Sequence, residues 1–404
     1  MSGNRTMILS GATLNGKIGA ATTTAPARSG GGEKMEINTD KPYKIFAEVL
    51  ERGALEQFES AMQQPFAVRG ALMPDAHTGY SLPIGAVVAT SGVVVPAWVG
   101  YDIGCGMCAV PTTFSKDAVR ENAKAIFDAI YKAVPVGFSH NSQPTKWKEA
   151  NDFDISPRMR EIFSRNGLEQ LGSLGGGNHF AEIGEDETGS IWIVIHSGSR
   201  GIGHAAAGHY MRLASGSDKA KEGHYGFAVD SKNGIDYIAD LRFCLAFALE
   251  NRREIISRIC NAIARITDGE GDFSQLINRN HNHAEERDGL WIHRKGATHA
   301  ESGMMGVIPG NMRDGSFIVR GRGNPESLYS SSHGAGRVLG RKEAQRTLDL
   351  GDFEDAMSGV VALVTKDTLD ESPFAYKDIF EVMRLQSGLV DTVAHIKPII
   401  NIKG

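Results

Sequence analysis

The sequence VGYDIGCGM, residues 99–107, places Asp102 and Cys105 three residues apart among glycines. A carboxylate and a thiolate are both metal ligands, and a thiolate is also a nucleophile. Gly104 and Gly106 let the backbone bend around a bound ion. The stretch therefore predicts a loop that presents reactive side chains at the end of a strand.

Three histidines lie in stretches of the same kind. His179 follows the tetrapeptide GGGN, His196 opens HSGSRGIG (196–203), and His333 lies within SSSHGAGR (330–337). Each stretch combines a metal-ligand or nucleophilic residue with a flexible backbone of small residues. We expect an active site built from loops at strand ends, with distant parts of the chain brought together by the fold.

The composition is that of an ordinary globular protein. The chain has 404 residues, of which 41% are hydrophobic and 23% charged, which is enough for a sizeable core. The scatter of the four reactive stretches favours one large domain. The formal net charge of −5 gives no sign of nucleic-acid binding, although a local basic patch would not show in the total.

The cysteines and the absence of targeting signals indicate the cellular compartment. No secretory signal and no apolar run of membrane-spanning length is evident, so we expect a cytoplasmic protein with reduced thiols. Cys244 and Cys260 lie in apolar helical stretches, and Cys108 precedes small apolar residues, so these three are predicted to pack in the core. Cys105 remains as the candidate for chemistry.

The chain divides into two parts. Residues 1–34 are rich in Gly, Ala, Thr and Ser and are predicted to be a disordered N-terminal extension. They include a stretch, 11–18, that resembles a phosphate-binding loop but lacks the Ser or Thr that would hold magnesium after its lysine. Residues 35–404 are predicted to form the catalytic domain.

Hydrophobic periodicity predicts a mixture of helices and strands. The expected helices cover 46–62, 117–134, 235–266 and a segment near 376–386. The expected strands lie within 68–95 and at 190–196, 316–320 and 398–404. Since no regular strand–helix–strand repeat connects them, the predicted class is α+β, a single large mixed domain.

Histidines are concentrated in the middle of the chain. Ten of the thirteen fall between positions 179 and 333, where an even spread would place about five. Their spacing does not fit one helical motif, so we expect ligands gathered by the fold, and a bridging cysteine would let them hold two ions. The predicted ligands, taken together, are Asp102, Cys105, His179, His196 and His281.

The alternatives for these residue types differ in strength. Cys105 and Cys108 form a C-x-x-C pair, but no second pair completes a structural zinc site. The remaining histidines fall into two groups. Those interpreted as solvated or core residues are His140, His209, His224 and His395. Those left open are His204, His283, His293 and His299.

The stretch around His333 favours phosphate chemistry. Gly334 and Gly336 allow backbone N–H groups to approach phosphate oxygens, and a helix beginning there would add a favourable dipole. A histidine in this setting can transfer protons or attack phosphorus. Nearby cationic residues predict a basic patch, unless they are ordinary surface charges; they are Arg294, Lys295, Arg320 and Arg322.

Together these stretches resemble the RtcB family of RNA ligases. The matching strings occur in order from residue 73 to the end of the chain, which makes the resemblance far more specific than any one glycine-rich motif. They are MPDAHTGY (73–80), PIG (83–85), GYDIGCG (100–106), GNHF (177–180), HSGSRG (196–201), HN (281–282), RKGAT (294–298), IPG (308–310), SHGAGR (332–337) and IKG (402–404).

The resemblance implies an enzyme that joins an RNA 3′-phosphate or 2′,3′-cyclic phosphate to a 5′-hydroxyl, using GTP and two Mn²⁺ ions. The five predicted ligands would hold manganese, with Cys105 shared between the ions, and His333 would become guanylylated. GMP would then pass to the RNA 3′-phosphate and be expelled by the 5′-hydroxyl. The implied guanylate-binding residues are Asn178, Glu182, His281, Asn282, Pro309, Gly310, Asn311, Met312, Ser316, His333, Gly334, Ala335, Gly336 and Lys403.

The resemblance also leaves alternatives open. Asn311 stands where serine is expected in the family, and Ser332 where cysteine is frequent. The competing hypotheses are a dinuclear metal phosphodiesterase, an enzyme that caps 3′-phosphate ends without ligation, and a non-catalytic RNA-binding subunit. Transfer-RNA splicing, RNA repair and activation by an archease-type partner are all compatible with the sequence.

Overall fold

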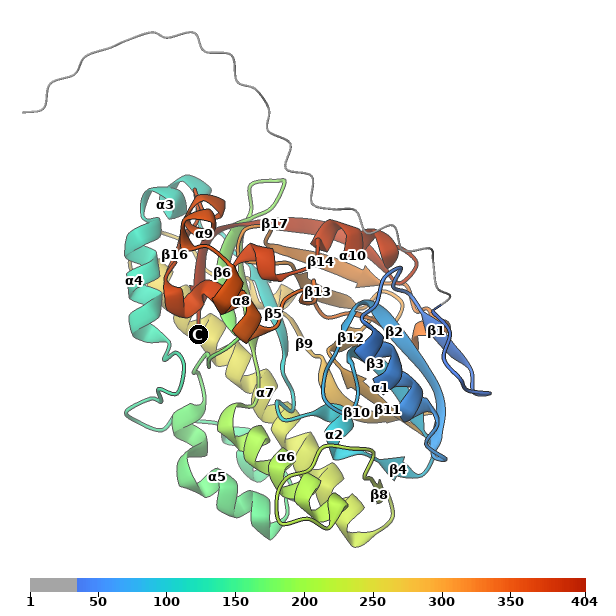
Figure 1. The fold of residues 1–404 in the computed structure, drawn as a ribbon. Coiled ribbons are helices and arrows are strands. Elements are labelled where there is room, and N and C mark those ends of the chain that lie inside the picture. The colour runs from blue at the N-terminus through green and yellow to red at the C-terminus, as the bar shows by residue number, and fades with distance from the viewer. Residues whose placement is uncertain (1–34) are drawn as a thin grey trace, which may run out of the picture. The chain divides into compact units, whose positions relative to one another are not determined.

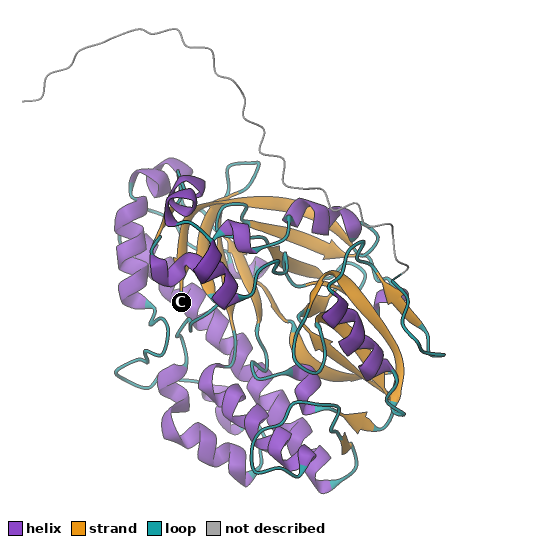
Figure 2. Cartoon of the chain, in the orientation of Figure 1, coloured by secondary structure: helices purple, strands orange, loops and turns teal. Residues whose placement is uncertain are grey.

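The computed structural model describes residues 35–404, of which residues 37–404 form one compact unit. The predicted N-terminal extension and its phosphate-loop-like stretch lie outside the described residues. Helices and strands alternate irregularly in the compact unit, which confirms the α+β class (Figures 1 and 2). Within the described part of the chain, no helix is long and apolar enough to cross a membrane.

The larger sheet is mainly antiparallel. Its strands run in the order β13 (Met305–Pro309), β14 (Ser316–Gly321), β17 (Val390–Lys403), β6 (Phe180–Glu185), β7 (Ile191–Ser197), β5 (Gly106–Pro111) and β9 (Ile277–Asn280), with β16 (Val361–Ala362) parallel to β17.

The centre of this sheet is buried on both faces. Along β7, Ile193 and Ile195 pack in the same apolar cluster as the helix residue Ile259, whereas Val194 packs with Met107 on the other face. Burial of both faces explains why the strand reads as a continuous apolar run rather than an alternating one. The predicted strand at 190–196 is confirmed.

One long helix supports the sheet and the site. Helix α7 (Lys232–Ala264) is a single helix of 33 residues, and the Ser231 side chain caps it by accepting a hydrogen bond from the Gly234 N–H. It contacts β5, β7 and β9, and Figure 1 shows it running behind this part of the sheet. Its neighbours are α4 (Ala123–Ala133) and α6 (Arg200–Ser215), and α6 in turn packs on α5 (Pro157–Gln170).

A second sheet lies beside the first. Its strands run in the order β1 (Tyr43–Ile45), β2 (Ala67–His77), β3 (Ile84–Thr90), β11 (Leu290–Lys295) and β10 (Asn282–Arg287). Helix α1 (Arg52–Met62) packs on β2 and β3. The shorter elements are α2 (Pro96–Val99), α3 (Lys116–Glu121), α8 (Arg341–Thr347), α9 (Leu350–Ala356), α10 (Ile379–Leu385) and the strand pairs β4 (Val93–Val94) with β8 (Phe227–Ala228) and β12 (Ala297–His299) with β15 (Ser330–Ser332).

One connection between the two sheets consists of a single residue. Strand β9 ends the larger sheet at Asn280, and β10 begins in the smaller sheet at Asn282. His281 therefore lies at the crossing point, held by a hydrogen bond from its backbone N–H to the Cys105 carbonyl at 2.8 Å. This contact fixes the junction of the sheets against the 99–107 stretch.

The helix expected at 117–134 is two helices, α3 and α4, because the backbone of Asn122 between them is not helical. Three other predicted elements differ in extent. The helix expected from residue 46 begins only at Arg52, because the Phe46 backbone N–H pairs with the Leu72 carbonyl of β2 instead. The helix near 376–386 is shorter, as α10, and begins after Asp378, whose side chain caps it. The final strand starts at Val390 rather than 398, because β17 crosses from β14 to β6 and continues through a bulge.

We predict that Gly106→Ala destabilises the fold at the start of β5. A Cβ atom there would lie 2.1 Å from the Arg279 carbonyl oxygen, which is backbone and cannot move aside freely. Overpacking of this kind costs about 1–3 kcal/mol or more. Urea unfolding should show the loss, whereas Gly388→Ala, where nothing lies within 4 Å of the added Cβ, should unfold as the wild type does. Equal midpoints for both variants would contradict the predicted strain.

Candidate metal centre and nucleotide cavity

Four of the predicted ligands converge because they flank adjacent strands. Cys105 precedes β5, His179 precedes β6, His196 is the penultimate residue of β7, and His281 follows β9. These strands are neighbours in the order β6-β7-β5-β9, and each pair is antiparallel. The starts of β5 and β6 and the ends of β7 and β9 therefore lie at the same end of the sheet, and the four side chains meet there.

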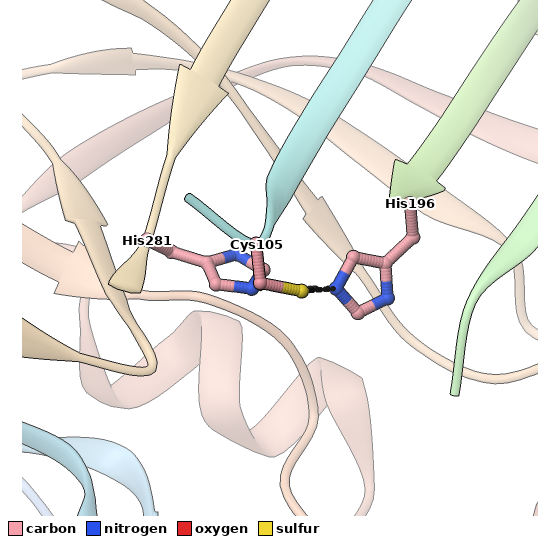
Figure 3. Close-up of side chains that lie close together, drawn as sticks. All are labelled: Cys105, His196 and His281. Atoms are coloured by element: carbon pink, nitrogen blue, oxygen red, sulfur yellow. Dashed lines mark hydrogen bonds between the residues drawn. The ribbon is translucent and has the colours of Figure 1, made fainter. Parts of the chain in front are cut away.

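The donor atoms lie at distances typical of ligands around an ion. The Cys105 Sγ is 3.2 Å from the His196 Nε2 and 3.4 Å from the His179 Nε2. The His196 Nε2 is 3.3 Å from the His281 Nε2, and the Asp102 Oδ2 is 3.0 Å from the His179 Nε2. Metal–ligand bonds of about 2.0–2.3 Å in a tetrahedron would separate donor atoms by roughly 3.3–3.7 Å, so this spacing fits. Figure 3 shows three of these side chains turned toward one point.

Two groups of three donors share the Cys105 thiol. One group contains His196 and His281, and the other contains Asp102 and His179. Within each group, the donor atoms lie within 4.8 Å of one another. A carboxylate, a thiolate and imidazoles form a donor set suited to transition metals such as Mn²⁺, Fe²⁺ or Zn²⁺. The arrangement fits two ions bridged by sulfur.

Backbone carbonyls orient two of the imidazoles. The His179 Nδ1–H donates to the Leu174 carbonyl at 3.0 Å, and the His196 Nδ1–H donates to the Asn178 carbonyl at 3.1 Å. Since each Nδ1 carries the proton, each Nε2 keeps its lone pair for a metal. Burial lowers the pKa of His196 and of His281 well below the usual value, which favours the neutral, metal-binding form.

The Cys105 thiol depends on positive charge nearby. Burial and the neighbouring Asp102 carboxylate raise its pKa well above the usual value, while the Arg252 guanidinium acts in the opposite direction. A coordinated divalent cation deprotonates a thiol outright. The cysteine therefore fits the role of a ligand better than that of a free nucleophile.

Arg252, on α7, is a supporting residue that the sequence did not reveal. Its side chain is fully buried, and its Nη1–H groups donate to the Gly104 carbonyl at 2.8 Å and to the Ser197 carbonyl at 2.9 Å. Its Nε–H and Nη2–H donate to the Asn278 and Asn280 side-chain oxygens, both at 2.7 Å. One guanidinium thus ties together the segments that carry Cys105, His196 and His281.

His333 is held by a carboxylate beside this cluster. Its Nδ1–H donates to the Asp75 Oδ2 at 2.7 Å, and its backbone N–H donates to the same oxygen at 3.2 Å. Although burial alone raises the pKa of Asp75, interaction with His333 lowers it below the usual value. The His333 ring lies 4.8 Å from the His281 ring, centre to centre. The Nε2 lone pair of His333 is therefore free, close to the metal ligands.

Asp75 belongs to the MPDAHTGY string, but the sequence alone gives it no role, because only the fold brings it to His333. It is fully buried on β2, and its second oxygen, Oδ1, has no hydrogen-bond partner among the described residues. A buried carboxylate that grips one imidazole nitrogen fixes the tautomer of the ring. The signal available in the sequence was an aspartate two residues before a histidine, which is too common to assign.

A cavity of about 310 Å³, here called the inner cavity, opens in front of His333. Most of the predicted guanylate-binding residues line it. They are Asn178, Glu182, Pro309, Gly310, Asn311, Met312, His333, Gly334, Ala335, Gly336 and Lys403. The other lining residues were not predicted to bind guanylate, although His196 among them is a predicted metal ligand; they are His77, Ile84, Phe180, His196, Gly315, Arg337, Arg341, Tyr376 and Asn401.

Three predicted guanylate-binding residues lie outside the lining of the inner cavity. His281 faces the metal ligands. Asn282 uses its side chain on backbone, donating to the Asp102 carbonyl at 3.2 Å and accepting from the Gly296 N–H at 2.8 Å. Ser316 is buried behind the wall, near Glu182, whose carboxyl does line the cavity.

Asn311 lines the inner cavity, but its side chain is engaged locally. Its Oδ1 accepts from the backbone N–H groups of Arg313 and Asp314, and its Nδ2–H donates to the Asp314 carboxylate at 2.7 Å. The residue therefore stabilises the turn between β13 and β14. Asparagine in place of the expected serine therefore contributes its side-chain hydrogen bonds to this turn.

The polar end of the inner cavity, defined here by Glu182 and Lys403, contains a buried carboxyl and a buried ion pair. Burial raises the pKa of Glu182 to about 8, and its Oε1 has no partner among the described residues. The Lys403 ammonium pairs with the Glu371 carboxylate at 2.6 Å. Such groups are costly to bury unless a ligand also uses them, so this end is suited to a polar, hydrogen-bonding ring.

Two expectations about charge are wrong. No helix begins beside His333, because the chain runs through turns until α8 starts at Arg341, so glycine N–H groups and side chains must supply the positive potential. Half of the predicted basic patch is also not at the surface: Arg294 and Lys295 are buried in the sheet, where Arg294 pairs with Glu285, whereas Arg320 and Arg322 are exposed. Both residues lie on β11, which is paired with β3 on one side and β10 on the other. The composition alone could not predict this position.

A third group of metal-ligand residues, His283, Glu285 and His299, lies away from the inner cavity. The two imidazole rings are stacked 4.7 Å apart and only 19° from parallel. Nearly parallel rings cannot both direct an in-plane lone pair at one ion. The Arg294 Nη1–H also donates to the His283 Nε2 at 3.1 Å, so this group is a buried hydrogen-bond and ion-pair network.

A second opening, here called the outer cleft, has a volume of about 760 Å³. Asp102 and His179 form part of its wall, whereas His196 and His333 face the inner cavity. The metal-ligand cluster therefore lies between the two spaces. The remaining wall residues are Tyr101, Gly137, Phe138, His140, Arg158, Ile162, Arg165, Asn166, Gln170, Gly176, Gly177, Arg200, Gly201, Ile202, His204 and Ala205.

Comparison with known proteins identifies the class of molecule. The family model described as tRNA-splicing ligase RtcB matches residues 57–161 and 149–404. The RNA-splicing ligase RtcB of Escherichia coli K12 is 34% identical over 388 residues, covering 88% of this chain and 95% of that protein. The tRNA-splicing ligase RtcB of Pyrobaculum aerophilum is 28% identical, covering 82% of this chain and 87% of its own. The protein is thus an enzyme of the ligase class.

More particularly, the chain belongs to the RtcB family. The resemblance recognised from the ordered strings of the sequence is confirmed, and so is the expectation of a ligase.

We predict that Arg252→Met weakens both the fold and the metal centre. The methionine fills much of the volume but leaves four acceptors, two carbonyls and two amide oxygens, without their donor. Each buried acceptor left without its donor costs about 1–3 kcal/mol. Thermal unfolding and Mn²⁺ titration should both show the loss. Arg253→Met, an exposed neighbour paired only with Glu250 on the same helix, serves as the matched control.

Wild-type Mn²⁺ affinity in a folded Arg252→Met protein would show that the guanidinium does not position the ligands.

Proposed function

We propose that this protein joins an RNA 3′-phosphate or 2′,3′-cyclic phosphate end to a 5′-hydroxyl end, using GTP, two Mn²⁺ ions and a guanylylated His333. The observation that carries the proposal is the contact between the Asp75 carboxylate and His333 at 2.7 Å, directly beside the metal-ligand cluster and facing the inner cavity. The relatives named above are RNA-splicing and tRNA-splicing ligases, which supports an RNA substrate.

His333 is the proposed nucleophile for GTP. Its Nε2 lone pair attacks the α-phosphorus, a P–N bond forms, the bond from that phosphorus to the bridging oxygen breaks, and pyrophosphate leaves. Asp75 accepts the Nδ1–H bond throughout, so it stabilises the positive charge that develops on the ring. The backbone of Gly334 and Gly336 lines the cavity next to the nucleophile and can approach phosphate oxygens closely.

The polar end of the inner cavity is suited to guanine. A guanine ring offers N–H donors on one edge and a carbonyl acceptor beside them. The Glu182 Oε1 has no partner among the described residues and would accept from a guanine N–H, a contact that favours the ionised carboxylate over the protonated form that burial stabilises. Lys403 is a donor held in place by Glu371. These two groups would pair with the donors and the acceptor of one guanine, which supports GTP over ATP because adenine has no carbonyl acceptor and no ring N1–H.

The ligands proposed for manganese are Asp102, Cys105, His179, His196 and His281, with the thiol shared. When bound, the ions would neutralise phosphate charge and polarise the phosphorus under attack. The protein side chains do the orienting: each histidine is aimed by its Nδ1 contact or by the strand that carries it, and the cysteine by the turn at Asp102.

Transfer to RNA uses the two openings on either side of the cluster. The RNA 3′-phosphate oxygen would attack the phosphorus of the guanylylated histidine, and the P–N bond would break. The 5′-hydroxyl oxygen would then attack the 3′-phosphorus, lose its proton and expel GMP. In such a displacement the incoming and departing oxygens lie on opposite sides of phosphorus. With GMP in the inner cavity, the 5′-hydroxyl strand would arrive through the outer cleft.

A cyclic phosphate end would first be opened to a 3′-phosphate by water at the same centre. We assign the activity to RNA repair or tRNA splicing in the cytoplasm, where Cys105 would stay reduced, and an archease-type protein is a candidate activator. All four cysteines are unpaired and buried, as a reducing environment requires.

We predict that GTP labelled at the α-phosphate leaves an acid-labile label on the wild-type protein in the presence of Mn²⁺. His333→Ala should give no label, because the nucleophile is gone. Asp75→Asn should label roughly 10²–10⁴-fold more slowly, because the tautomer of His333 is no longer fixed. Asp391→Asn, which changes an exposed carboxylate paired only with Arg322, should label normally.

Label on His333→Ala would contradict the nucleophile assignment. Hydrolysis of cyclic phosphate ends without GTP, and without joining, would instead favour a dinuclear phosphodiesterase. Transfer of GMP to a 3′-phosphate end that is never joined would favour an end-capping enzyme.

A further inference from the structure

The outer cleft contains one aromatic side chain that the proposed chemistry does not use. Phe138 has a relative exposure of 101%, so no other part of the described chain covers its ring. Single exposed apolar residues are ordinary on protein surfaces. Phe138 differs in location, because the wall on which it stands also carries Asp102 and His179.

The backbone under Phe138 is fixed on both sides. The Gly137 N–H donates to the Gly175 carbonyl at 2.9 Å, and the Gly137 carbonyl accepts from the Arg200 Nη2–H at 3.1 Å. The Ser139 N–H closes the turn by donating to the Val136 carbonyl at 3.1 Å. The backbone that carries the ring is thus bonded to the glycine loop that precedes His179. This backbone therefore loses little conformational entropy when a partner binds.

The rest of the cleft combines aromatic and cationic groups. Tyr101, the residue before Asp102, stacks on His204 with ring centres 4.8 Å apart and planes 22° from parallel. Arg158 and Arg165 also line the cleft and share the exposed carboxylate of Glu161. Exposed ion pairs of this kind are weak, so a phosphate can compete for the guanidinium groups.

Aromatic faces beside a cationic groove are the features by which proteins hold single-stranded nucleic acid. A hydrophobic peptide would also use an exposed phenyl ring, but it would make no use of the two arginines. An acidic peptide would use the arginines but not the ring. The combination, next to donor groups built for phosphate chemistry, favours an RNA strand.

We propose that Phe138 is a positioning residue that stacks on a nucleobase of the RNA strand entering the outer cleft. The stack would hold the nucleotide close to the strand end and so place that end at the Asp102 and His179 side of the cluster. The inference rests on the proposed function, since it takes RNA as the ligand. It adds a base contact, independent of phosphate and of GTP, to that function.

The first test measures binding of a short, fluorescently labelled 5′-hydroxyl RNA with Mn²⁺ and without GTP, so that no joining occurs. Phe138→Ala should raise Kd by about 5- to 100-fold, the range expected for loss of one base–aromatic stack. Phe138→Leu should raise Kd nearly as much as Phe138→Ala does, and Phe138→Trp should leave Kd unchanged or lower it. Phe380→Ala, an exposed aromatic on α10, is the matched control and should bind normally.

The second test locates the base. A single abasic nucleotide is moved along the 5′-hydroxyl strand, and ligation is measured with wild type and Phe138→Ala. At one position near the end, the abasic substrate should slow wild type as much as the mutation does, and the two changes together should cost no more than either alone. Labelling of His333 from GTP should be the same in wild type and Phe138→Ala.

Three results would overturn the inference. These are an unchanged Kd in Phe138→Ala, a wild-type Kd in Phe138→Leu, or abasic and mutational losses of ligation rate that simply multiply at every position. Failure of the proposed function looks different: wild type would not label from GTP or join ends, while the binding series would still report whether Phe138 holds RNA. Binding of a peptide but not of RNA would assign the cleft to a protein partner.

Discussion

The buried guanidinium of Arg252 is the constraint on which the site depends. It reaches from the middle of α7 to the turn before Cys105, the end of β7 and the strand that leads to His281. The oxygens that accept its hydrogen bonds are all neutral, so they do not cancel its positive charge, and that charge acts on the metal-ligand cluster. That charge opposes the burial that raises the pKa of the Cys105 thiol. The longest helix thus positions the ligands and also favours their metal-binding state.

The strand arrangement explains why the chemistry is divided in space. The edge shared by β5, β6, β7 and β9 holds the proposed metal ligands, and His333 enters from β15, a different sheet. Asp75 comes from β2 of the second sheet and meets His333 there. The inner cavity therefore lies between sheets, where a nucleotide can be enclosed, whereas the outer cleft faces the helices and stays accessible to a longer strand.

Sequence reasoning recovered the parts of the fold that local patterns determine. The helix at 235–266 and the strand at 190–196 follow from periodicity, and the glycine-bordered Asp102 and Cys105 follow from residue chemistry. What it missed depends on contacts between distant segments. Arg252 looked like one more charge on an amphipathic helix, and Asp75 gained meaning only from β2 lying against β15. Arg294 seemed a surface charge because burial by a neighbouring strand leaves no local signal.

The most direct test of the central claim counts metal ions. In our account the Cys105 thiol is shared by two groups of donors, so the purified protein should bind two Mn²⁺ per chain, and electron paramagnetic resonance should show two spins coupled through sulfur. Cys105→Ser should lose that coupling. A single ion per chain, or two ions that do not interact in the wild type, would contradict the bridged centre on which the proposed chemistry is built.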